Sequence, residues 1–167
     1  MSPLFRRSAT PDIPGLTLEP GERSLARAAA ADGAIAATTH RLVLPVPEGF
    51  HAIDWIDIER AGWDGDEQAL VVLEAAPVGD RPRRHRVRMG NEQRLLDVIR
   101  EQVQASVVLS RHVPIVGERG IRISARRRPG DQRLVWKVAV DSGLDIDNAE
   151  VRARVDAAVA AARTDVE

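Results

Sequence analysis

Short apolar runs separated by turn residues fill the first half of the chain. From Gly21 to Met89, apolar and polar positions alternate or form brief apolar runs, a spacing typical of strands in an antiparallel meander. The pattern predicts about seven strands, of which the first three lie at about 22–31, 34–39 and 41–46. The first is rich in alanine and would also suit a helix. The turn signal "ADG" and the β-branched run that follows it favour paired strands instead.

The alternation changes phase within "FHAIDWIDIE", residues 50–59. Trp55 is in phase with the apolar residues before it. The next apolar pair, Ile56 and Ile58, falls on the opposite phase. A bend or a single helical turn here would point Trp63 inward again. Turn residues at 64–67 and 77–82 predict two further hairpins.

The apolar period then lengthens from two residues to between three and four. This change predicts an amphipathic helix that starts at Glu92 and has Asn91 as its N-cap. Pro114 marks a break soon after the helix. The predicted apolar stripe consists of Leu95, Leu96, Ile99, Val103 and Val107.

A hairpin and a second helix are predicted at the end of the chain. "GIRISARRR" and "RLVWKVAV" flank the turn "PGDQ", and Trp136 and Val138 share one face of the second predicted strand. "DNAE" at 147–150 is typical of a capping box with Asp147 as the cap, and its helix would run to about Arg163. The predicted class is therefore α+β.

Three segments resemble the pleckstrin-homology-like family, in particular its bacterial and GRAM-type members. They are "GERSLARA"; "ADGAIAATTHRLVL", in which Thr38, Arg41 and Leu42 form a Thr-x-x-Arg-Leu step; and "IDWIDIERAGWD", with a short turn at Asp57 and Ile58. The resemblance implies a seven-stranded barrel capped by a helix, and a role in binding lipids or proteins rather than in catalysis.

The predicted organisation has three parts. Residues 1–20 contain four prolines and form a flexible arm, residues 21–110 form the barrel with its capping helix, and residues 111–167 form a hairpin and helix extension packed on the barrel. Lipid-binding members carry basic residues between their first two strands. This chain has "AAAADGAIA" there, with Asp32 and no base, so inositol-phosphate recognition of the usual kind is not expected.

Composition limits the chemistry. At 167 residues, with 44% hydrophobic and 29% charged residues, the chain suits one globular domain or a small domain with an extension. The absence of cysteine excludes disulfides, thiolate nucleophiles and cysteine-ligated metals. No apolar stretch has the length of a signal peptide or of a membrane span, so a cytoplasmic protein is expected.

The net charge of −1 conceals an uneven distribution. Residues 1–80 carry a net charge of −7, residues 81–137 carry +10 and residues 138–167 carry −4. The basic middle third could steer an anionic partner, or could pair with the acidic parts of the same chain.

Two arginine clusters are the candidate binding residues. Arg84, Arg86 and Arg88 would line one face of a strand, where they could bind phosphates, protect a sheet edge by their charge, or pair with the acids at 54–59. The second cluster lies at a predicted hairpin end and consists of Arg126, Arg127 and Arg128. A nucleic-acid role is disfavoured because the chain has no tyrosine, only two phenylalanines and an acidic pI.

The other candidate chemistry is weak. The histidines at 40, 51, 85 and 112 have no metal-binding spacing, so a metal site would have to be assembled by the fold. "DIDN" and "DGDE" lack the glycine and glutamate of a calcium loop, and no nucleophile elbow or phosphate-binding glycine loop follows a predicted strand. The three tryptophans are expected in the core.

The sequence therefore predicts a binding or scaffolding module without catalytic residues, cofactor or metal. A protein partner is the first expectation, because strand edges and a dipolar surface suit one. Peripheral binding to anionic lipid headgroups through the arginine rows is the alternative.

Overall fold

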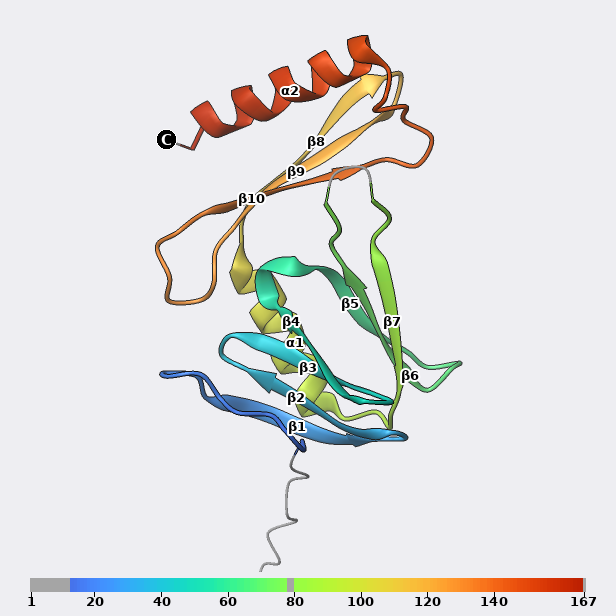
Figure 1. Ribbon diagram of the computed structural model, residues 1–167, viewed down its shortest axis with the longest axis vertical. Coiled ribbons are helices and arrows are strands. Elements are labelled where there is room, and N and C mark those ends of the chain that lie inside the picture. Colours follow the sequence, from blue (N-terminus) through green and yellow to red (C-terminus); the bar gives the residue numbers. More distant parts are fainter. Residues whose placement is uncertain (1–12, 78–79, 167) are drawn as a thin grey trace, which may run out of the picture.

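The computed structural model describes residues 13–77 and 80–166, which form ten strands in three antiparallel sheets, two α-helices and one short 3₁₀ helix (Figure 1). The strands are β1 (Ser24–Ala30), β2 (Gly33–Thr38), β3 (Arg41–Val46), β4 (Gly49–Asp54), β5 (Ile58–Asp64), β6 (Ala69–Glu74), β7 (Arg83–Arg88), β8 (Val107–Val116), β9 (Arg119–Arg126) and β10 (Val135–Val140). The helices are η1 (Trp55–Asp57), α1 (Gln93–Ser106) and α2 (Ala149–Thr164). The α+β class is confirmed.

The first seven strands form two sheets in a meander. The first sheet has the order β1-β2-β3-β4 and the second has the order β5-β6-β7. One antiparallel bridge, Ala30 with Met89, joins β1 to the end of β7. Within the described residues the sheets do not close into a continuous barrel. The alanine-rich run forms β1, as its turn signal predicted, and not a helix.

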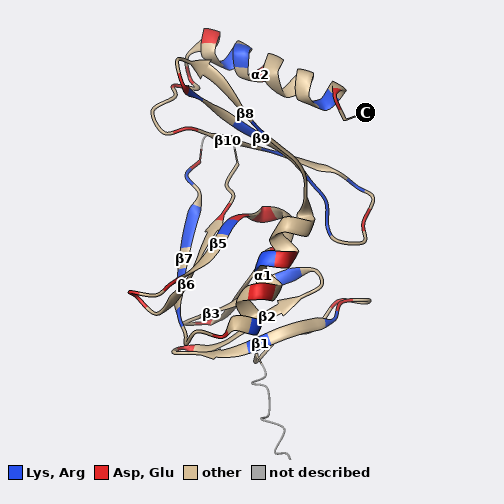
Figure 2. Ribbon diagram, turned by 180° about the vertical axis from the view of Figure 1, so that it is seen from behind, with Lys and Arg blue, Asp and Glu red and all other residues tan. Residues whose placement is uncertain are grey.

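A continuous apolar core fills the space between these two sheets and α1. The core includes Trp55, which is fully buried and donates from its indole Nε1 to the Thr38 carbonyl at 2.9 Å. Trp55 begins η1, the single helical turn that the change of phase indicated, and η1 leads from the first sheet into the second. From α1, Leu95 and Ile99 enter the core, and the helix lies across both sheets (Figure 2). The predicted amphipathic helix is thus confirmed, although its stripe ends before Val107, which belongs to β8.

A third sheet and α2 form a second unit above the first (Figure 1). Its order is β10-β9-β8, so β9 is the central strand. Ile121 and Ile123 of β9 pack with Val155 and Ala162 of α2 in a separate apolar core, which Trp136 of β10 also contacts. The other face of the sheet is turned toward the first seven strands.

The predicted extension was incomplete because it lacked β8. The segment from Val107 to Val116 does alternate, but Arg111 interrupts its apolar face and Pro114 suggested a break. In the structure Pro114 lies at a register shift opposite Gly120. A Cβ at Gly120 would lie 1.9 Å from the Val113 carbonyl oxygen, so only glycine allows this close approach.

Both predicted helix caps were wrong by one residue. Glu92, and not Asn91, is the N-cap of α1, and it makes no side-chain cap hydrogen bond. Asn148, and not Asp147, caps α2, where its Oδ1 accepts from the backbone N–H groups of Glu150 and Val151. Asparagine and aspartate are equally good caps, so adjacent candidates cannot be ranked by residue type. No helix in the described ranges is both long and apolar enough to cross a membrane.

The chain before β1 is tied to the turn between β2 and β3. Residues 1–12 of the expected arm lie outside the described residues. Beyond them, the Thr17 carbonyl accepts from Arg41, and the Glu19 carboxylate bonds to His40. Glu22 is buried and accepts from the Arg41 guanidinium at 2.9 and 3.1 Å. Burial acts to raise the pKa of Glu22, but the hydrogen bonds from Arg41, Thr38 and the Glu19 backbone outweigh it and lower the pKa to about 2.

Candidate functional site

The first arginine row lies where the alternation placed it. Arg84, Arg86 and Arg88 are exposed on the outer face of β7, whereas Val87 and Met89 are buried on the inner face. β7 is an edge strand of the second sheet, and its basic stretch is visible from behind in Figure 2.

The second cluster is divided by the fold. Arg126 is buried, with 7% of its surface exposed, and donates to the Ile58 carbonyl at 2.5 Å. Arg128 donates from Nε to Asp54 at 2.6 Å, a hydrogen bond that raises the pKa of Arg128. The backbone N–H of Arg127 donates to the Ser106 carbonyl. The contacts of Arg126 and Arg128 reach β5 and β4, and the contact of Arg127 reaches the end of α1.

Two of the three acids at 54–59 form ion pairs with β10 or with the loop that leads to it, and neither pairs with β7. Asp54 bonds to Arg128, and Asp57 bonds to Lys137 of β10. On β7, Arg86 reaches Glu67 at 3.4 Å, while Arg84 makes no ion pair with another described residue. The sequence could not distinguish these pairings because both clusters are basic and both come later in the chain.

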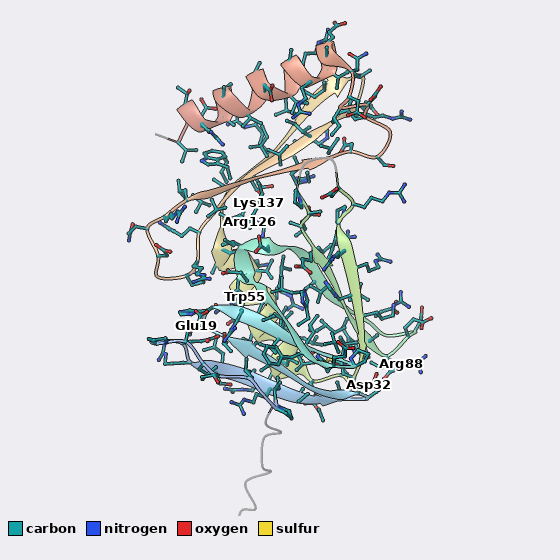
Figure 3. The ribbon with its side chains drawn as sticks, in the orientation of Figure 1. Glu19, Asp32, Trp55, Arg88, Arg126 and Lys137 are labelled. Atoms are coloured by element: carbon teal, nitrogen blue, oxygen red, sulfur yellow. The ribbon has the colours of Figure 1, made fainter. Side chains whose placement is uncertain are left out.

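A groove of about 470 Å³ lies where the second and third sheets meet. Its basic residues come from both sheets: Arg60 from β5, Arg122 and Arg126 from β9, and Lys137 from β10. Figure 3 shows Arg126 and Lys137 close together at this junction and Arg88 at the far end of the second sheet. The rest of the lining is small or apolar apart from one acid: Glu59, Leu73, Ala75, Ala76, Val107, Ser110, Ser124, Val138 and Ala139.

A second hollow, of about 380 Å³, continues the groove along the outer face of the second sheet. The two hollows share Arg60 and Leu73. Strand register explains the arrangement. Leu73 of β6 is paired with Arg60 of β5 on one side and with Arg84 of β7 on the other. Two residues away on the same face of β6, Val71 is paired with Arg86. Arginines therefore flank a short aliphatic strip. We call the two hollows together the basic groove.

Arg126 is the unusual residue of the basic groove. No carboxylate of a described residue lies within ion-pair distance of its guanidinium, although Glu59 and Asp57 are near enough to act on it electrostatically. Burial lowers the pKa of Arg126, and these two acids only partly offset that effect. A buried cation without an ion-pair partner is costly, and an anionic group in the groove would relieve that cost.

The structure also brings together two histidines that the sequence separates. His51 of β4 and His85 of β7 both bond through Nε2 to the same oxygen, Oε2, of Glu74 at the end of β6, at 3.0 and 2.6 Å. Spacing along the chain gave no signal for this cluster, because its residues come from three strands in two sheets.

No family model, no curated protein and no solved structure matches the chain.

Proposed function

We propose that the protein is a non-enzymatic binding module and that the basic groove binds an acidic, extended segment of a protein partner. The observation that carries this proposal is Arg126, a buried guanidinium that lines the groove with no carboxylate within ion-pair distance. A carboxylate supplied by a partner would form a charge-assisted hydrogen bond there, in a site with low access to water.

The shape of the basic groove favours a protein segment over a lipid headgroup. The two adjoining hollows form an elongated site with an aliphatic strip that includes Val71 and Leu73. A single headgroup would occupy one hollow and leave this strip uncovered. An extended peptide would place carboxylates near Arg60 and Arg122 and apolar side chains on the strip.

We further propose that residues 21–110 are an open variant of the pleckstrin-homology-like module. The support is a meander of four and three strands in two sheets, followed by a helix that contacts both. The bridge between Ala30 and Met89 joins the ends of β1 and β7. In a closed barrel, the hydrogen bonds between these two strands would continue from this corner. Such modules use strand edges and the surfaces beside them to bind peptides.

A designed peptide tests the proposed binding. The probe is a fluorescein-labelled 12-residue peptide of alternating glutamate and valine, measured by fluorescence anisotropy against a peptide in which glutamine replaces glutamate. We expect binding of the acidic peptide that weakens at least tenfold in the double variant R60Q/R122Q and that falls with added salt. The matched control is R94Q/R152Q, which removes two exposed arginines outside the groove and should bind as the parent does.

A second arm separates the lipid alternative. The same three proteins are sedimented with vesicles that contain phosphatidylserine. Vesicle binding that depends on Arg60 and Arg122, without peptide binding, would support the headgroup alternative instead. Equal losses in the two double variants would show that only net charge matters and would contradict the proposed groove.

A further inference from the structure

Three potential metal-ligand atoms converge at one point between the first two sheets. They are Nε2 of His51, Nε2 of His85 and Oε2 of Glu74, and all three lie within 4.8 Å of one another. The Glu74 oxygen is 3.0 Å from one ring nitrogen and 2.6 Å from the other. In a tetrahedral zinc site with bonds of about 2.0–2.1 Å, neighbouring ligand atoms are about 3.3 Å apart. The three atoms therefore need only small shifts to surround one ion.

The backbone holds these side chains in place. Val72 is paired with His85 across β6 and β7, and Glu74, two residues further along β6, lies on the same face as the buried Val72. His51 comes from β4 in the other sheet, and its ring stacks on that of His85 with centroids 5.0 Å apart. A site assembled from strands of two packed sheets is largely formed before any ion arrives.

The donors select the kind of ion. Two imidazoles and one carboxylate suit Zn²⁺ and related transition metals, whereas Ca²⁺ and Mg²⁺ need mostly oxygen ligands. The side chains are partly buried, with 32% of His51, 18% of Glu74 and 21% of His85 exposed, so water can complete the coordination.

A second cluster of similar composition differs in one decisive respect. Glu19, Glu22 and His40 also converge, but the guanidinium of Arg41 already bonds to both oxygens of Glu22. That cation neutralises the cluster and would repel a metal ion. Near Glu74 the closest base by register is Arg83, which is exposed and makes no ion pair with another described residue.

We propose that His51, Glu74 and His85 bind one divalent transition-metal ion, with Zn²⁺ as the test ion, and that this ion links the two sheets of the first unit. Without the ion, the bond between His51 and Glu74 joins the two sheets, and the bond between His85 and Glu74 lies within the second sheet. Binding exchanges those hydrogen bonds for three metal bonds and holds β4 against β6 and β7. The site is independent of the basic groove, because it lies on the inner face of the second sheet and shares no residue with the groove.

The test uses the untagged chain after treatment with EDTA. We expect one equivalent of Zn²⁺ to bind in calorimetry and to raise the Tm, and Co²⁺ to give a visible absorption band of a low-coordinate site. Binding should weaken at least tenfold in H51Q and in H85Q. The control H112Q removes a histidine of the third sheet, which bonds to Asp141 there, and should keep full affinity.

A measurement on the unaltered protein tests the proposal even if the histidine variants fail to fold. In NMR spectra of the histidine ring protons, Zn²⁺ should shift His51 and His85 and leave His40 and His112 unchanged. No binding of Zn²⁺ or Co²⁺, or shifts spread evenly over all four histidines, would overturn the proposal and leave a hydrogen-bonded link only.

Discussion

The two units of the molecule are packed in different ways. The first seven strands and α1 enclose a core to which 15 buried residues of the described chain contribute, from Ala26 to Ile99. The third sheet and α2 share a core of five buried residues, and the other apolar side chains around it are only partly covered. Two sheets and a helix cover a core from three sides, whereas a sheet covered by one helix has only one dry face.

This difference explains where the basic groove lies. The uncovered face of the third sheet cannot be apolar, and it carries Ser124, Arg122 and Lys137, which are small or charged. That face meets the first unit through polar contacts, which include the hydrogen bond from Arg126 to Ile58 and the ion pair of Lys137 with Asp57. A polar junction between the units is loosely packed and keeps charged side chains at a groove. A tightly packed apolar junction would have had neither the groove nor the charges. The comparison predicts that the first unit supplies stability and that the junction supplies binding.

The largest expected effect is the loss of a core tryptophan from the first unit. Trp55→Ala should lower the free energy of unfolding by about 4 kcal/mol, because a fully buried ring and its hydrogen bond to Thr38 are lost. Trp136→Ala, in the partly covered second core, should cost about half as much or less. Urea unfolding followed by circular dichroism measures both. Equal losses in the two variants would contradict the comparison.

Acid should weaken the first unit at Glu22. Its pKa is lowered from 4.5 to about 2, so its ionised form stabilises the folded state. That contribution is complete above about pH 4.5 and is lost as the pH falls toward 2, and by linkage it amounts to about 3 kcal/mol. Unfolding measured between pH 5 and 2 should be less pH-dependent in Glu22→Gln. Glu101→Gln, an exposed acid on α1, serves as the control and should follow the parent curve.

The junction should respond to Asp54 by a smaller amount. Asp54 accepts from Arg128 in the loop between β9 and β10 and from the backbone N–H of Ile56, so Asp54→Ala should cost about 1–2 kcal/mol. Native-state hydrogen exchange should show faster exchange in β9 and β10 than in the parent protein. Asp64→Ala, which removes hydrogen bonds only within the turn between β5 and β6, should leave exchange in β9 and β10 unchanged.

The smallest effect is expected within the third sheet. Asp141, just after β10, accepts from the Gly120 N–H at 2.7 Å and bonds to His112 at 2.8 Å, so it holds the three strands together. Asp141→Asn keeps the shape but weakens both bonds, at a cost of about 1 kcal/mol. Hydrogen exchange should accelerate in β8 to β10 and stay unchanged in β1 to β4. Faster exchange in both units would show that they do not behave separately.

Regular patterns made most elements of the fold predictable. The strands at 41–46, the turn after Trp55 and the helix that contains Leu95 follow from apolar period alone, because one buried face imposes that period on the chain. β8 was missed because it is an edge strand with a mostly exposed face, so burial imposed a weaker pattern on it. The cap of α2 was missed because the adjacent Asp147 and Asn148 are equally suitable, whereas α1 begins at Glu92 without any side-chain cap bond, so the preference for Asn91 did not apply.

The sequence by itself determined the local elements, the faces they bury and the basic character of the middle third. Tertiary structure alone decided which charges meet. Asp54 finds Arg128 and Asp57 finds Lys137 across gaps of 74 and 80 residues, and two histidines from different sheets find one glutamate. Local elements follow from contacts between near neighbours in the chain, which a sequence displays directly. Sites arise where distant segments pack together, and that packing depends on how whole sheets are joined.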